Sequence, residues 1–167
     1  MLSPRLIDEL NLQIKYEMFS AQLYLSMAAW CADQQLDGFV IWFKAQAEEE
    51  KFHAMRFFEF IDDMGGRVKM TGFEDPQGDF ESLTEVFEYS LEHEKFVSKR
   101  IYHLMNIAQE EKEHATISFL NWFVDEQREE EKSFSGVLQQ VKRFGGEGLY
   151  HLDKELSTRV FTPPVIA

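Results

Sequence analysis

Apolar residues recur every three or four positions along four long stretches of the chain. In the first stretch, these positions step alternately by four and three from Leu10 to Cys31. This spacing is typical of an amphipathic α-helix with one buried face and differs from the strict alternation of a strand. Ser3 and Pro4 form a typical helix start before the first stretch. The pattern predicts four long helices and a short fifth one, over residues 4–32, 39–64, 83–112, 115–143 and 149–159.

The breaks between these stretches predict how the helices connect. The breaks at 33–38 and 112–115 are short, which favours antiparallel helix pairs. The break at 65–82 contains four of the nine glycines, and its extended length of up to ~60 Å exceeds the ~40 Å of one long helix. We therefore expect one all-α domain over residues 1–167. It is a four-helix bundle of two antiparallel hairpins joined by a long crossover, with a short C-terminal fifth helix.

The composition of the chain limits the classes of partner that the protein can bind. The 167 residues carry a net charge of −13, so phosphate backbones and anionic lipid surfaces would repel the protein. We therefore expect the protein to bind cations, and we expect no nucleic acid or membrane partner. The longest apolar run is far shorter than the roughly 20 residues of a membrane helix. The N-terminal residues do not resemble a signal peptide, and one cysteine fits a reducing compartment, so a cytoplasmic location is expected.

Each of the four predicted apolar faces is interrupted near its middle by polar residues. Glu17 interrupts the first face, Glu50 the second, Glu94 the third, and Gln127 with Glu130 the fourth. A carboxylate in a bundle core is costly unless it is protonated or paired with a cation, and no Lys or Arg lies on these faces. We therefore predict bound metal cations. The alternative is a shifted register that turns the glutamates toward solvent.

The spacing of these residues places them at one level of the bundle. Glu50 follows Glu17 by 33 residues, and Gln127 follows Glu94 by 33. His53 follows Glu50 by three positions, as Glu130 follows Gln127, and residues three apart share a helix face. Four ionised carboxylates would balance two divalent metals, and oxygen ligands with one imidazole suit Fe, Mn or Zn. Glu50 lies between the other ligands, so we expect it to bridge the two metals.

At these residues the sequence resembles the prokaryotic non-haem ferritins, over essentially the whole chain. The matching segments surround the polar positions and read NLQIKYEMFSAQLYLSMAAW, AEEEKFHAM, LEHEKFV and FVDEQREEE. The resemblance implies a ferritin-like bundle assembled into a homo-oligomeric cage of 24 subunits that stores iron. It also implies a ferroxidase centre that oxidises Fe(II) with dioxygen or hydrogen peroxide and delivers Fe(III) to a mineral core.

The resemblance implies a di-iron centre with assigned ligands. By position, Glu17, Glu50 and His53 correspond to the ligands of the first iron. The same comparison makes Glu50, Glu94 and Glu130 the ligands of the second iron. Glu50 is thus the ligand common to both.

Further positions acquire roles only from the resemblance. Tyr24 corresponds to the tyrosine beside the centre, and Gln127 to the residue next to it. Glu49, Glu126 and Glu129 correspond to the ligands of a third iron site, and the resemblance extends to Glu130 as a ligand shared with the di-iron centre.

Haem is not expected. Bacterioferritins carry a haem-ligating Met where this chain has Lys51, and they have a second Glu-x-x-His where this chain has Gln127 and Glu130.

Two other classes of function stay open at this point. One is a di-iron oxidase or peroxide-detoxifying enzyme that stores nothing, and the other is a helical scaffold that binds no metal. Glu111 and His114 form a second Glu-x-x-His pattern at the turn between the third and fourth helices. We expect a solvated helix end there, with a role in iron entry as the alternative.

Overall fold

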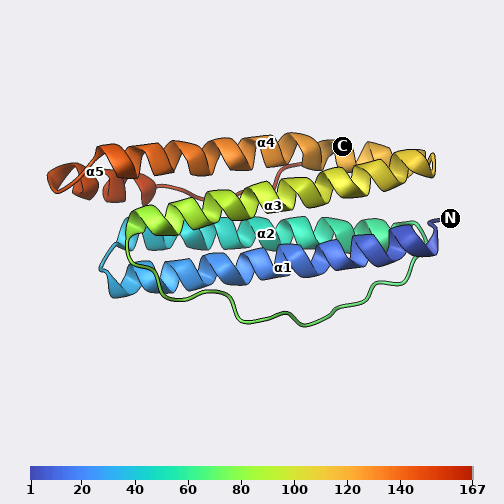
Figure 1. The fold of residues 1–167 in the computed structure, drawn as a ribbon, viewed down its shortest axis with the longest axis horizontal. Helices are drawn as coiled ribbons and strands as arrows, with labels where there is room; N and C mark the ends of the chain where they lie inside the picture. Colours follow the sequence, from blue (N-terminus) through green and yellow to red (C-terminus); the bar gives the residue numbers. More distant parts are fainter. Residues whose placement is uncertain (167) are drawn as a thin grey trace.

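The computed structural model describes residues 1–166, and these fold into five helices with no strand among them. The four long helices lie side by side as a bundle, and the short fifth helix packs at one end (Figure 1). This confirms the predicted all-α fold. The helices are α1 (Pro4–Asp33), α2 (Asp37–Asp63), α3 (Leu83–Glu110), α4 (His114–Arg143) and α5 (Glu147–Leu156).

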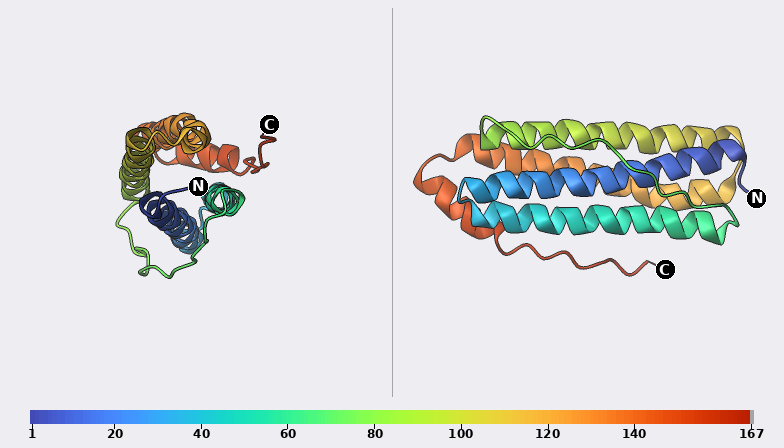
Figure 2. Two further views of the ribbon diagram at one scale, coloured as in Figure 1. Left: turned by 90° about the vertical axis from the view of Figure 1, so that its right-hand side faces the viewer. Right: turned by 90° about the horizontal axis from the view of Figure 1, so that it is seen from below.

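The long crossover between α2 and α3 runs the length of the bundle outside α1, so α2 and α3 point in the same direction (Figures 1 and 2). Hydrogen bonds fasten both ends of the crossover to α1. The Asn11 side-chain amide donates to the Arg67 carbonyl and accepts from the Lys69 backbone N–H, at 3.0 and 2.6 Å. At the other end, the Trp30 indole N–H donates to the Phe80 carbonyl at 3.1 Å. The predicted two-hairpin topology is therefore confirmed.

Several helix boundaries differ from the prediction by one to three residues, and the differences at α2 and α5 involve contacts between these two helices. α2 begins at Asp37, two residues early, because α5 supplies its N-terminal cap. The Asp153 carboxylate accepts hydrogen bonds from the backbone N–H groups of Gly38 and Phe39 at 3.0 and 3.1 Å. α5 spans Glu147–Leu156, whereas 149–159 was predicted. The chain then runs back along α2 as an extended tail (Figure 2).

The hydrophobic core consists of two clusters with a polar layer between them. One cluster surrounds Phe43, Phe87 and Phe134, toward the α5 end of the bundle. The other surrounds Phe57 and Phe123, toward the opposite end. Every long helix contributes to both clusters, and its polar interruption falls between the two contributions. Within the described residues, no helix has the length and apolar character needed to cross a membrane.

Candidate metal centre

Each long helix places one carboxylate in the polar layer at the middle of the bundle. The side chains of Glu17, Glu50, Glu94 and Glu130 belong to residues that are only 0, 2, 1 and 4% exposed. The predicted register of all four helices is therefore right, and the alternative with solvent-facing glutamates is excluded. Four carboxylates from four helices converge in one water-poor region.

These carboxylates and His53 form two groups that share Glu50. Ligand atoms of Glu17, Glu50 and His53 lie within 4.8 Å of one another, and so do those of Glu50, Glu94 and Glu130. His53 faces the first group through Nδ1, which lies 3.2 Å from Glu50 Oε2 and 3.9 Å from Glu17 Oε2. The geometry therefore suits two metal ions with Glu50 between them.

Buried amides and one phenol hold the carboxylates in place. Gln13 donates to Glu17 at 2.9 Å, and Gln46 donates to both Glu50 and Glu130 at 2.9 Å. Gln13 and Gln46 were not among the predicted site residues. Each lies four residues before a core glutamate on the same helix face, and that spacing is the signal that could have identified them.

Glu94 is held by two of the residues that the sequence singled out. Gln127 donates its amide N–H to Glu94 Oε2 at 3.1 Å, and the buried Tyr24 hydroxyl donates to Glu94 Oε1. Tyr24 and Gln127 thus both contact Glu94, and their part in metal chemistry stays a prediction. The Gln127 amide donates to Glu94. Gln127 therefore contacts the ligand group of Glu50, Glu94 and Glu130 through the Glu94 carboxylate.

Several buried ligand atoms lack any hydrogen bond. Glu17 Oε2, Glu130 Oε1 and His53 Nε2 have no such partner in the structure. Nε2 faces Glu126 at 3.5 Å, which is too long for a strong hydrogen bond. An unsatisfied buried oxygen costs about 1–3 kcal/mol, and a metal ion would satisfy these atoms. The residues present therefore fit bound metal.

The electrostatics of the metal-free layer point the same way. Burial raises the pKa of Glu94 to about 7. The pKa values of Glu50 and Glu130 are raised well above the ordinary range. Burial is the largest cause, and the negative charge of Glu94 is the second. Burial lowers the pKa of His53, but its contacts with Glu126 and Glu50 outweigh that effect and raise this pKa overall. Without metal, the layer therefore retains protons, which metal ions would displace.

A third group of ligands borders the first two. Ligand atoms of Glu49, His53, Glu126 and Glu130 lie within 4.8 Å of one another. Glu129, which was predicted with them, lies outside this group. It is exposed and, with the other glutamates of the group, lines a hollow of about 220 Å³ on the bundle surface. Burial raises the pKa of Glu49, partly opposed by the charges of His53 and Arg159.

The Glu111 and His114 pattern does not join the centre. Both side chains are exposed at the turn between α3 and α4, and neither belongs to any of the three ligand groups found among residues 1–166. Their exposure agrees with the expected solvated helix end.

The bundle, its crossover and its buried carboxylate and histidine layer define a ferritin-like protein. The family model of the ferritin-like domain matches residues 7–144. The chain belongs to the ferritin family of iron-storage proteins, as the sequence resemblance indicated.

Relatives and solved structures agree over nearly the whole chain. The bacterial non-heme ferritin of Staphylococcus aureus strain MRSA252 is 42% identical over 163 residues, which cover 96% of this chain and 98% of the relative. The Staphylococcus haemolyticus protein of the same name is 41% identical, with the same coverage. An open pore ferritin from Archaeoglobus fulgidus superposes with a TM-score of 0.93 at 42% identity, covering 95% of this chain and 99% of that one. An engineered closed form of that ferritin superposes with a TM-score of 0.95 at 43% sequence identity. The match covers 97% of this chain and 100% of that one.

Proposed function

We propose that this chain is a ferroxidase subunit whose di-iron centre binds Fe(II) as its substrate. Glu17, Glu50 and His53 bind one Fe(II), and Glu50, Glu94 and Glu130 bind the other. The observation that carries this proposal is the pair of buried ligand groups that share Glu50 and leave ligand atoms without hydrogen bonds. The four carboxylates carry −4 when ionised, which balances two Fe(II) ions.

The reaction that fits this centre is a two-electron oxidation. Each Fe(II) gives one electron and becomes Fe(III). Dioxygen takes up two electrons and two protons to form hydrogen peroxide, or hydrogen peroxide takes up two electrons and two protons to form two waters. The two Fe(III) ions then carry a total charge of +6, against −4 on the four carboxylates. This imbalance weakens their retention unless further anions enter, and it favours release of Fe(III) toward the mineral.

Tyr24 is the proposed catalytic tyrosine. Its hydroxyl donates to Glu94, and burial raises its pKa well above the ordinary value, so the phenol keeps its proton. It therefore holds Glu94 in position as charge develops at the irons.

The third group of carboxylates is the proposed route out of the centre. Glu130 belongs to both the second and the third ligand groups, so an ion can change partners without losing all its ligands. Glu49, Glu126 and Glu129 then border the hollow that opens to solvent. We propose that iron binds there in transit. We propose no haem, since Lys51 is engaged by Glu48 at 2.8 Å and offers no thioether.

The functional unit that we propose is a homo-oligomeric cage of 24 subunits in the cytoplasm. Support comes from family membership and from large apolar side chains left exposed on the subunit. Among them, Ile41, Tyr102 and Tyr150 are 41, 48 and 57% exposed. The single cysteine, Cys31, is buried in the core, which is compatible with a reducing compartment.

Aerobic addition of Fe(II) to the metal-free protein tests the proposal. Absorbance follows the formation of Fe(III), and sedimentation shows whether the iron travels with a large particle. We expect Glu50→Gln to slow oxidation by about tenfold or more, since even the outer partners of metal ligands have effects of that size. Glu48→Gln is the matched control, because Glu48 is an exposed neighbour on α2. Wild-type protein that oxidises iron no faster than buffer would refute ferroxidase activity, and oxidised iron that stays outside the particle would favour an oxidase without storage.

A further inference from the structure

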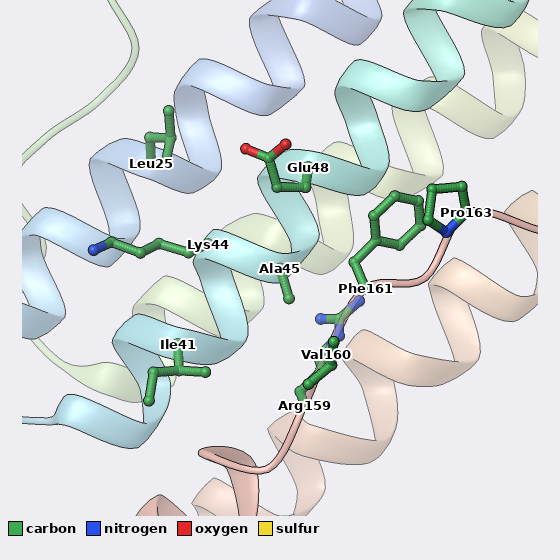
Figure 3. A pocket seen from close by; sticks show the side chains of 9 residues that line it. All are labelled: Leu25, Ile41, Lys44, Ala45, Glu48, Arg159, Val160, Phe161 and Pro163. Carbon is green, nitrogen blue, oxygen red and sulfur yellow. The ribbon is translucent and has the colours of Figure 1, made fainter.

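The C-terminal tail brings a positive charge to the third ligand group. After α5 the chain runs back beside α2 (Figure 2). In Figure 3, Arg159, Val160 and Phe161 lie along this tail next to α2. The Phe161 ring contacts the ring of Phe52 on α2, with 5.9 Å between their centroids. The tail is therefore fastened to the bundle at the level of the metal centre.

The guanidinium of Arg159 is fixed by several contacts. Its Nη2 atom donates to Glu49 Oε2 at 2.9 Å and to Gln46 Oε1 at 2.6 Å. Its Nη1 atom donates to the Trp42 carbonyl at 3.3 Å, and the group lies over the Trp42 ring at 4.3 Å. The side chains of Arg159 and Glu49 are only 22 and 19% exposed. Such a pair is screened less than one on the surface.

These contacts join Arg159 to two parts of the metal centre. Glu49 is a member of the third ligand group, and the guanidinium already occupies one of its oxygens. Because Gln46 accepts from Arg159 through Oε1, its Nε2 is directed to Glu50 and Glu130. A cation that binds Glu49 meets both a competing donor and a like charge.

We propose that Arg159 is a resident counter-ion of the third ligand group, and that a metal ion must displace it from Glu49 to bind there. This inference rests on the proposed function of the metal centre. Arg159 weakens the third site, so that iron passes through it and is not retained. The first two sites do not use Glu49, and Arg159 reaches them only through Gln46, so their affinity changes less than that of the third site.

Zn(II) titration of the metal-free assembled protein tests this inference without redox chemistry. Calorimetry measures the affinity of each site in wild type, Arg159→Gln, Arg159→Lys and Arg100→Gln. Arg100 is the matched control, since it pairs with Glu9 at 2.8 Å and lies 5.0 Å from the Tyr16 ring. Like Arg159, Arg100 has an ion pair and a contact with an aromatic ring, but neither of these partners belongs to the three ligand groups.

We expect Arg159→Gln to tighten the weakest Zn(II) site by about tenfold, within the usual range of coupling between two ligands. Arg159→Lys keeps the charge and should stay closer to wild type, and Arg100→Gln should leave all affinities unchanged. Phe161→Ala, which loosens the tail but keeps Arg159, should shift the third site in the same direction by less.

Two results separate failure of this inference from failure of the proposed function. If wild type binds two Zn(II) ions tightly and Arg159→Gln binds the third no better or more weakly, Arg159 is not a competitor. If wild type binds no Zn(II), the proposed metal centre itself is wrong and this inference fails with it.

Discussion

The buried Glu94 carboxyl should make the metal-free protein less stable as the pH rises. Burial raises the pKa of Glu94 from 4.5 to about 7, so the folded state binds this proton more tightly than the unfolded state does. The resulting stabilisation is fully present below pH 4.5 and is lost as the pH rises through about 7. Replacing Glu94 with Gln removes this titration and keeps the shape of the side chain.

The size of the effect follows from the two pKa values. Each pKa unit corresponds to about 1.4 kcal/mol, so the contribution of Glu94 is about 3 kcal/mol in total. Most of it, roughly 2 to 3 kcal/mol, is lost between about pH 5 and pH 8. Because Glu94 is buried among other ionisable groups, solvent does not screen this cost.

Denaturant unfolding in the presence of a chelator measures this effect. The free energy of unfolding of Glu94→Gln relative to wild type should increase by roughly 2 to 3 kcal/mol from about pH 5 to pH 8. Glu92→Gln is the control, since Glu92 is an exposed residue of α3 paired with Lys95. A relative stability of Glu94→Gln that stays constant with pH would show that Glu94 ionises as it does in water, and the electrostatic account of the layer would be wrong.

Three further substitutions test other parts of the molecule. Tyr24→Phe removes the donor to Glu94 and should slow Fe(II) oxidation by about tenfold in stopped-flow absorbance; an unchanged rate would contradict the role of the hydroxyl. Gln127→Glu adds a carboxylate beside Glu94 and should slow release of the second metal to a chelator; unchanged exchange would show that position 127 does not set retention. Gly38→Ala would place a Cβ 1.6 Å from the Asp153 carbonyl oxygen, so we expect α5 to shift and the protein to lose about 1–3 kcal/mol of stability in thermal unfolding. A variant as stable as wild type would contradict this packing.

The bundle and the core of the site could be predicted because their signals are local and repeated. A step of three or four residues identifies the buried face of each helix, and a glutamate on that face is conspicuous because burial is costly. Equal spacing of 33 residues between Glu17 and Glu50, and between Glu94 and Gln127, placed them at one level. The structure confirms that level, whereas iron binding itself stays a prediction.

The parts that could not be predicted depend on contacts between distant segments. Gly38 resembled a helix breaker, but Asp153, 115 positions later, caps α2 at that point. Arg159 looked like the end of a fifth helix, and its contact with Glu49 spans 110 positions. No local pattern encodes the path of the tail. The role of Glu129 stays a prediction, since family position suggests a ligand and the structure places this exposed residue in the lining of the hollow, outside the third ligand group.

The position of the polar layer between two apolar clusters explains how the centre can fill and empty. In a small structural zinc site, metal binding provides the folding free energy and removal unfolds the domain. Here Phe43, Phe87 and Phe134 close the bundle on one side of the layer, and Phe57 and Phe123 close it on the other. The metal-free state should therefore stay folded, with protons on the buried carboxyls in place of metal. A bundle that holds its ligands in place without metal can bind iron as a substrate and release it, which a storage protein requires at every turnover.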